Sequence, residues 1–139
     1  MWTIDDCFAL RLKKASEDMM RYYTDVMEPC GVTPSQYIII YRIQELEGAS
    51  MKEVADALAI DKSTLARTIK PLEKKGLIYN QAPPNSHRYQ LAVTEEGRRV
   101  LREGGQLWQG AQQHIADMLG EEGVKDYNAL LNILKNEKK

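Results

Sequence analysis

The sequence predicts a mainly helical fold in which a helix-turn-helix is followed by a two-stranded β-hairpin and is flanked by long helices. Three observations predict it. Apolar residues recur every three or four positions towards both ends of the chain, which is the period of an amphipathic helix. Two capped helices separated by a tight turn occupy the middle. After them the pattern changes to two β-like runs around a Pro-Pro-Asn loop.

The first predicted helix starts at the Thr3 cap and ends before Pro29. Its apolar stripe consists of Phe8, Leu12, Ala15, Met19, Tyr22 and Val26. At 1.5 Å per residue such a helix is roughly 35 Å long. Because that is long for a chain of this size, we expect part of the stripe to pack against something outside the domain.

Three helices are predicted next from their caps. Thr33 with Gln36 forms a capping box that opens a second helix ending at Gly48, and Ser50 opens a short third helix. Asp61 caps a fourth helix that ends at Gly76.

Residues 77–79 and 89–93 are predicted as strands of a hairpin, joined by the loop 81–86. Thr94 then caps a fifth helix that ends at Gly120, and a last helix follows. Glycines 104, 105 and 110 inside the fifth helix indicate either a kink or a close helix–helix approach.

Composition limits the class of protein. The 139 residues fit one domain, and 43% apolar with 28% charged residues is ordinary globular composition. No apolar run approaches the length of about 20 residues that a membrane span needs, and the acidic N-terminus does not resemble a secretory signal. Two cysteines do not form a disulfide framework, so we expect a reducing cytoplasm.

Charge is distributed unevenly along the chain. Residues 1–61 hold 6 Lys/Arg and 11 Asp/Glu, a net of −5, whereas residues 62–102 hold 9 and 3, a net of +6. Residues 103–139 hold 4 and 6, a net of −2. This basic island predicts a localised polyanion-binding surface. The alternative is a chance grouping of solvated lysines.

The fourth helix is the predicted recognition helix. Leu65, Ile69 and Leu72 set its buried direction, and at about 100° per residue a polar and basic stripe faces the opposite way. Such a helix can enter the major groove of DNA. The expected DNA-binding residues are Lys62, Ser63, Thr64, Arg67, Thr68, Lys70 and Lys74. The competing interpretation is a solvated surface helix.

The hairpin that follows makes this unit a winged helix. Its tip can reach the adjacent minor groove, and the residues expected there are Asn85, His87 and Arg88. Only Arg88 carries a permanent charge.

These residues resemble the MarR family of winged-helix regulators along nearly the whole chain. The matching stretches are DKSTLAR (61–67), PLEKKGLI (71–78) and LAVTEEG (91–97). The resemblance implies one domain over 1–139, with dimerisation helices at 1–30 and 95–139 and a DNA-binding lobe at 33–94. It also implies a homodimer that binds a pseudo-palindromic operator and is released by a small ligand or by oxidation.

The wing departs from the family pattern. Ala82, Pro84, Asn85 and His87 stand where the family carries an acid, an arginine, a second acid and a later arginine. Either operator affinity is weaker, or the wing uses Asn85, His87 and Arg88 differently.

Cys7 begins the string CFAL (7–10), which resembles the reactive-thiol segment of the organic-hydroperoxide branch of the family. That branch also uses a tyrosine where this chain has Pro34, and Tyr22 or Tyr23 would have to replace its other partner tyrosine. The alternative is a small buried apolar side chain. A disulfide from Cys7 to Cys30 is excluded, because a helix of roughly 35 Å separates them.

A ligand pocket is expected between the dimerisation helices and the winged helix. Five aromatic residues could line it, or could be plain core: Tyr22, Tyr23, Tyr37, Tyr41 and Trp108. The ligand would be small and aromatic or apolar.

The sequence predicts no enzyme, metal site or cofactor, since no nucleophile–base set, zinc-ligand spacing or phosphate loop is present. The predicted function is a cytoplasmic, homodimeric repressor that binds double-stranded DNA and is released by a small ligand. Two alternatives remain: a peroxide sensor that uses Cys7, and a winged helix that contacts other proteins without recognising an operator.

Overall fold

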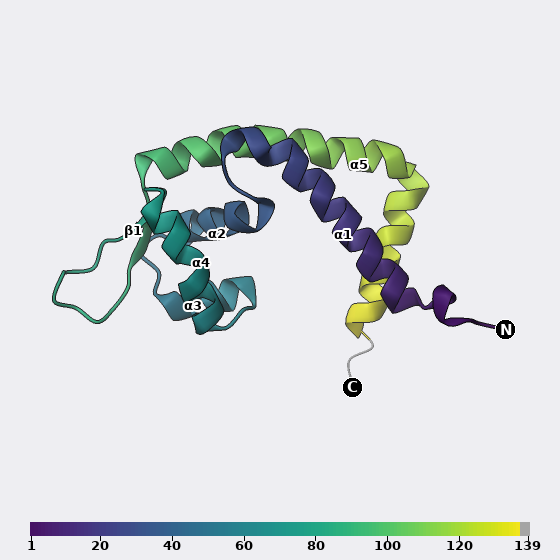
Figure 1. The fold of residues 1–139 in the computed structure, drawn as a ribbon, viewed down its shortest axis with the longest axis horizontal. Helices are drawn as coiled ribbons and strands as arrows, with labels where there is room; N and C mark the ends of the chain where they lie inside the picture. The colour runs from purple at the N-terminus through teal and green to yellow at the C-terminus, as the bar shows by residue number, and fades with distance from the viewer. Residues whose placement is uncertain (137–139) are drawn as a thin grey trace.

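The computed structural model describes residues 1–136, which form an arch (Figure 1). Helix α5 (Glu95–Asn136) runs along the top of the arch and bends down at one end. A compact lobe of residues 33–94 lies below the other end. Helix α1 (Phe8–Met27) descends from the middle of the arch and packs against α5.

The N-terminal helix is shorter than predicted. Thr3 caps a separate 3₁₀ turn, η1 (Ile4–Asp6), in which the Asp6 carboxylate accepts a hydrogen bond from the Thr3 amide at 2.9 Å. Cys7 then has extended backbone (φ −59°, ψ 117°), which separates this turn from α1. A second 3₁₀ turn, η2 (Glu28–Cys30), follows α1. The prediction of one continuous helix from Thr3 was therefore wrong.

The helix-turn-helix forms as predicted, because each helix is capped by side chains close by in the sequence. Its two helices are α3 (Met51–Leu58) and α4 (Lys62–Lys74), and α2 (Pro34–Glu45) precedes them. The Thr33 hydroxyl accepts from the Gln36 amide at 3.2 Å, and the Ser50 hydroxyl accepts from the Glu53 amide at 3.1 Å. Ala59 adopts φ +57°, and this left-handed residue makes the turn between α3 and α4.

The wing has shorter strands and a longer loop than predicted. Strand β1 (Ile78–Asn80) pairs antiparallel with β2 (Leu91–Val93), with Ile78 opposite Val93. The loop therefore covers 81–90 rather than 81–86. On its other edge β2 is bridged to Ala49, whose carbonyl accepts from the Leu91 amide at 2.9 Å. This bridge ties the wing to the loop between α2 and α3.

Glycines allow α5 to approach its neighbours closely and to bend. A Cβ on Gly97 would lie 2.1 Å from the Leu77 carbonyl oxygen, and one on Gly104 would lie 2.9 Å from the Tyr37 ring. The predicted close approach is thus confirmed at Gly104, whereas Gly110 has open space around it. The helix bends at Gly120, which has φ 73° and ψ 172°, and this is where the sequence predicted a break.

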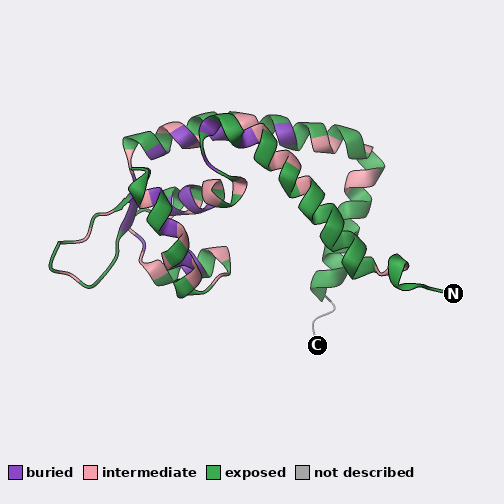
Figure 2. Ribbon diagram, viewed as in Figure 1, coloured by how far each residue is buried: buried purple, intermediate pink, exposed green. Residues whose placement is uncertain are grey.

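The core lies almost entirely in the lobe and where the lobe joins α5 (Figure 2). Met27 is the sole buried residue of α1, and beyond Ala111 the described part of α5 has none. Large apolar side chains stay exposed on both, including Phe8 (77%) and Ile133 (60%). None of the helices in residues 1–136 contains an apolar stretch of the length that a membrane span requires.

Candidate nucleic-acid interface and pocket

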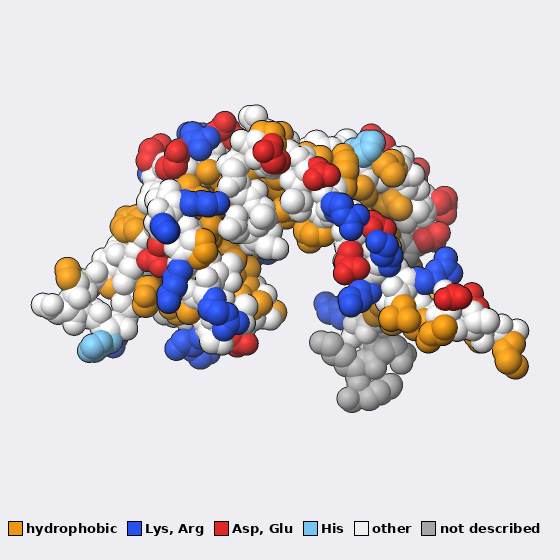
Figure 3. Space-filling model, viewed as in Figure 1, with side chains coloured by type: hydrophobic (Ala, Val, Ile, Leu, Met, Phe, Trp, Pro, Cys, Tyr) orange, Lys and Arg blue, Asp and Glu red, His pale blue; other side chains and the backbone are white. Residues whose placement is uncertain are grey.

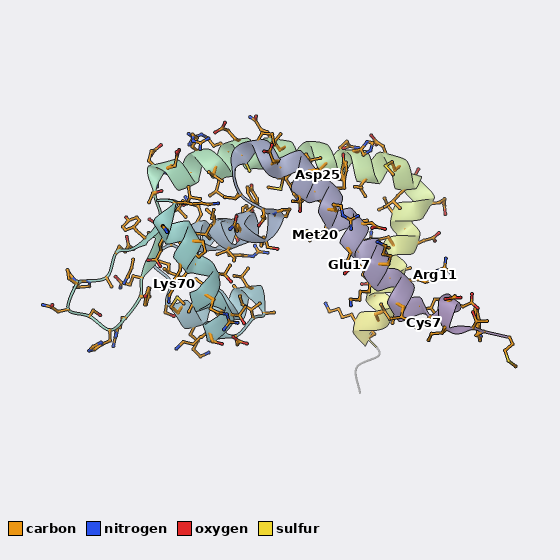
Figure 4. The ribbon with its side chains drawn as sticks, in the orientation of Figure 1. Cys7, Arg11, Glu17, Met20, Asp25 and Lys70 are labelled. Carbon is orange, nitrogen blue, oxygen red and sulfur yellow. The ribbon has the colours of Figure 1, made fainter. Side chains whose placement is uncertain are left out.

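Helix α4 presents the predicted polar stripe to solvent. Leu65, Ile69 and Leu72 are buried in the core, as the phasing predicted. Four side chains on the opposite side are exposed: Ser63, Arg67, Lys70 and Lys74. Lys and Arg side chains gather along the side and lower edge of the lobe, where α3 and α4 lie (Figure 3). Figure 4 shows Lys70 on α4.

The first turn of α4 is organised by Asp61. Its carboxylate accepts from the Thr64 amide at 2.7 Å and from the Ser63 hydroxyl at 2.7 Å. These hydrogen bonds, above all that from the Thr64 amide, lower the pKa of Asp61 to about 2. Asp61 therefore stays charged and holds the N-terminus of α4, including the exposed Lys62, in place.

The two threonines of α4 are half-buried. The Thr68 hydroxyl donates to the Thr64 carbonyl at 2.7 Å, and the Arg67 guanidinium lies 3.5 Å from the Thr64 hydroxyl. The Thr68 hydroxyl hydrogen is thus used within the helix, which leaves its methyl group and oxygen lone pairs for an external contact.

The basic island separates into paired and unpaired cations. Arg98 and Arg99 at the start of α5 form ion pairs with carboxylates of the same helix. Arg67, Lys70 and Lys74 form no ion pair within residues 1–136. These three unpaired cations of α4 are therefore available to a polyanion.

The wing places its cation beside the helix-turn-helix. Arg88 and His87 line an open cleft of about 630 Å³ together with Lys52 of α3 and Lys62 of α4. Lys52 pairs with Asp56 at 2.8 Å. Neither Lys62 nor Arg88 pairs with a carboxylate in the part of the chain that the structure describes. Asn85 is exposed on the loop between Ala82 and Arg88.

A second cavity, of about 490 Å³, lies between α1, α2 and α5. Four of the five aromatic residues predicted for a pocket line it: Tyr23, Tyr37, Tyr41 and Trp108. Tyr22 does not; its ring packs against His114, with centroids 5.4 Å apart. The Tyr23 hydroxyl donates to Gln112 at 2.5 Å, and the Tyr37 hydroxyl donates to the Leu101 carbonyl at 3.3 Å. Burial raises the pKa of both tyrosines.

Sequence reasoning missed the one charged residue of this cavity, Arg42. Its guanidinium pairs with Glu45 at 2.6 Å and lies 5.6 Å from the centre of the Tyr41 ring. The signal was present in α2, because Pro34, Ile38 and Arg42 repeat at a spacing of four and so share a helix face with the predicted tyrosines.

Cys7 is half-buried at the N-terminus of α1, and Figure 4 places it at the end of the molecule away from Lys70. Cys30 is buried, and both thiols are free in the described part of the chain. Within residues 1–136 no three His, Cys, Asp or Glu side chains gather where a metal ion could be held.

Comparison with known proteins begins with the lobe. Residues 32–89 match the model of the MarR family. The HTH-type transcriptional regulator SarZ of Staphylococcus epidermidis is 28% identical over 87 residues, which is 62% of this chain and 59% of SarZ. The match thus spans about three fifths of that relative. The organic hydroperoxide resistance transcriptional regulator of Bacillus subtilis is 25% identical over 129 residues, 93% of this chain and 86% of that protein.

Solved structures share the whole fold. The transcriptional repressor CouR bound to p-coumaroyl-CoA has a TM-score of 0.85 at 20% identity, over 96% of this chain and 95% of CouR. The same repressor bound to a 23-mer DNA duplex has a TM-score of 0.81 at 21% identity, over 96% and 93%. The family match, the similar regulators and the common fold agree with one another, and on these grounds residues 32–89 of the chain are a MarR-family segment.

Proposed function

We propose that this protein is a dimeric transcriptional regulator that binds a specific DNA operator through α4 and the wing. The observation that carries the proposal is the exposed cationic stripe of Arg67, Lys70 and Lys74, which has no carboxylate partner within residues 1–136 and stands on a helix anchored by buried aliphatic residues. The relatives are named as transcriptional regulators rather than as enzymes, and CouR has been captured on a DNA duplex.

Different residues of the stripe would contact the bases and the phosphates of DNA. Arg67, with Ser63 and Lys62 on the N-terminal half of α4, would reach base edges in the major groove, where an arginine can bind guanine in a bidentate manner. Lys70 and Lys74 lie further along the helix and would meet phosphates. Thr64 and Thr68 flank the stripe, and Asn85, His87 and Arg88 would touch the neighbouring minor groove.

The exposed apolar faces of α1 and of α5 beyond Gly120 support a homodimer. In the proposed arrangement, residues 1–30 and 95–139 form the dimer interface, and the lobe 33–94 binds DNA. Residues 137–139 of that interface segment lie outside the described residues. Two lobes related by a two-fold axis would read a pseudo-palindromic operator.

The cavity between α1, α2 and α5 supports release by a small ligand. Its walls are mainly aromatic and apolar, so a small aromatic or apolar molecule would fit, and the Arg42 guanidinium, which is paired with Glu45, keeps further N–H donors for a polar group of that molecule. Since α2 lines the cavity and is joined through Ala49 to the wing, a ligand there would shift the lobe and lower operator affinity. The protein would then act as a repressor.

Oxidation of Cys7 is a second candidate signal. It is favoured by the match to a regulator named for organic hydroperoxide resistance over 93% of this chain, and by a free, half-buried thiol. Cumene hydroperoxide would release DNA from the wild-type protein but not from Cys7→Ser. Equal release from both would eliminate this signal.

A regulator with free thiols that acts on DNA would work in the cytoplasm.

A salt titration tests DNA binding. Duplexes selected from a random pool are bound at increasing salt, and log affinity should fall linearly with log salt, with a slope set by the number of phosphates contacted. The selected duplex should also bind far more tightly than a scrambled one. A flat salt response, or equal affinity for both duplexes, would instead favour a winged helix that contacts proteins.

A further inference from the structure

The neck of the wing is held by one side chain, Asn80. Its Oδ1 accepts from the Ala82 amide at 3.0 Å and from the Gln90 amide at 2.9 Å. Its Nδ2 donates to the Arg88 carbonyl at 3.4 Å. Asn80 is the last residue of β1, and the three groups lie on both sides of the loop, so this half-buried amide bridges the two arms of the wing.

Below Asn80 the wing is firmly part of the lobe. Leu91, the partner of Asn80 in β2, is buried, and its carbonyl accepts from the Gly48 amide at 3.1 Å while its amide donates to Ala49. Above Asn80 two backbone hydrogen bonds cross the loop: the Gln81 amide donates to the Gln90 carbonyl beside Asn80 at 2.9 Å, and the Ser86 amide donates to the Pro83 carbonyl at the tip at 2.9 Å. The direction in which the loop leaves the lobe therefore depends on the Asn80 side chain.

Arg88 is the residue that this arrangement places. Its carbonyl is bonded to Asn80, and its amide donates to the Ser86 hydroxyl at 3.0 Å. Its side chain lines the cleft shared with Lys62, the first residue of the recognition helix. The Arg88 carbonyl is thus tied to the end of β1 and its amide to the loop itself, although the side chain is exposed and unpaired within residues 1–136.

We infer that Asn80 is a positioning residue for DNA binding: it holds the neck of the wing so that Arg88 reaches DNA beside the N-terminus of α4. This inference rests on the proposed function. Preorganisation is its physical basis, because a cation on a fixed backbone loses less conformational entropy on binding than one on a loose loop. Holding Arg88 in place would compensate for the low charge of the wing, which has no second arginine to contribute to DNA binding.

Amide hydrogen exchange tests the neck without any DNA. In Asn80→Ala the Ala82 and Gln90 amides lose their acceptor and should exchange several-fold to about tenfold faster. Asn80→Asp retains an acceptor oxygen and should restore their protection. Gln90→Ala is the matched control, because it removes a neighbouring amide side chain but leaves all the backbone groups of the neck. Unchanged protection in Asn80→Ala would overturn the inference.

A double-mutant cycle then tests the action through Arg88. Asn80→Ala should weaken binding to the selected duplex about fivefold and lower the salt slope, as Arg88→Ala should, with the helical circular dichroism signal and Tm nearly unchanged. The double variant should bind no more weakly than Arg88→Ala alone, since Asn80 then has nothing to position. Gln90→Ala should bind like the wild type.

Two results separate failure of the inference from failure of the proposed function. If the wild type binds duplexes and the losses from Asn80→Ala and Arg88→Ala are additive, Asn80 acts independently of Arg88 and the inference is wrong. If the wild type binds no duplex at all, the proposed function is wrong and with it the role in DNA binding, while the exchange rates still show whether Asn80 holds the neck.

Discussion

At the scale of residues, one side chain fixes where α4 begins, and another is proposed to contact the bases of DNA. Asp61 holds the first turn through the Thr64 amide and the Ser63 hydroxyl, and Arg67 projects one turn further on. Asp61 is a local and titratable cap, whereas Arg67, which is proposed to contact bases, is exposed and always charged. Each therefore gives a test of its own.

Replacing Asp61 by Asn should alter the response of stability to acid. The pKa of Asp61 is lowered from 3.8 to about 2 in the folded protein. Its contribution to stability is therefore complete above the unfolded pKa and is lost as pH falls from about 4 to 2. Asn caps helices equally well but does not titrate. Over that range the Tm of Asp61→Asn, measured by circular dichroism, should fall less steeply than that of the wild type; parallel curves would contradict this role.

Arg67→Ala should weaken binding to the selected operator by about 1–3 kcal/mol and relax the preference at one base position. Lys74→Ala is the comparison: because Lys74 would meet phosphate, its loss should weaken binding to all duplexes alike and reduce the salt slope by about one unit. Fluorescence anisotropy on the operator and on single-base variants measures both. Unchanged operator affinity in Arg67→Ala would mean that another face of α4 meets the DNA.

At the scale of elements, two close contacts of α5 require glycine, which has no side chain. The first turn of α5 lies against the end of α4 and the start of β1, with Gly97 facing the Leu77 carbonyl. Two turns later, Gly104 lets α5 approach the Tyr37 ring of α2. The orientation of the lobe under α5 follows from these two approaches.

Gly97→Ala should therefore destabilise the protein by about 1–3 kcal/mol, because its Cβ would overlap the Leu77 carbonyl. Gly110→Ala is the matched control on the same helix. It has open space around it, and should stabilise α5 by about 0.5–1 kcal/mol. Urea unfolding of both variants measures the difference, and similar free energies of unfolding for the two would show that α5 does not need this approach.

The wing gives a second prediction at this scale. Arg88→Ala should reduce affinity for operators with A·T-rich flanks more than for those with G·C-rich flanks, since narrow A·T minor grooves concentrate negative potential. Competition binding with the two flank types measures the ratio, and Tm is recorded for the same variant. A fall in Tm with no change in the ratio would show that the wing merely braces α4.

The whole molecule is an arch with a well-buried core in the lobe and apolar helices exposed at the opposite end. Among the exposed side chains there are Phe8 of α1 and Leu134 of α5. Monomeric proteins rarely leave such surfaces open to water. In the proposed dimer a second copy would cover them and would also set the distance between the two α4 helices.

Light scattering should therefore give a mass near twice 15.9 kDa at micromolar concentration. Leu134→Asp should shift the protein towards the monomer, because burying an unpaired carboxylate in the interface is costly. Lys125→Asp, on another face of the same helix, also adds a negative charge and should remain dimeric. A monomeric wild type would refute the dimer, and equal masses for the two variants would move the interface away from Leu134.

Much of the fold was predictable because its signals are local. The caps at Thr33, Ser50 and Asp61 join groups three residues apart, the turn at Ala59 follows directly, and the bend at Gly120 is a property of one residue. The stripe on α4 follows from helical period alone. These features do not depend on which elements a helix packs against, so they could be predicted from the sequence alone. The family resemblance could be recognised from the sequence as well.

Only the tertiary structure decided which distant groups meet. Tyr23, Tyr37 and Trp108 come from three helices, and their convergence on one cavity with Arg42 depends on the approach at Gly104. The strands end early because the Asn80 side chain, rather than further ladder pairs, takes up the Ala82 and Gln90 amides. Tyr22 lies outside the cavity, although it is adjacent to Tyr23, because neighbours in a helix point about 100° apart. Such contacts depend on how packed elements are oriented, and that orientation is settled by the burial of all their apolar faces at once.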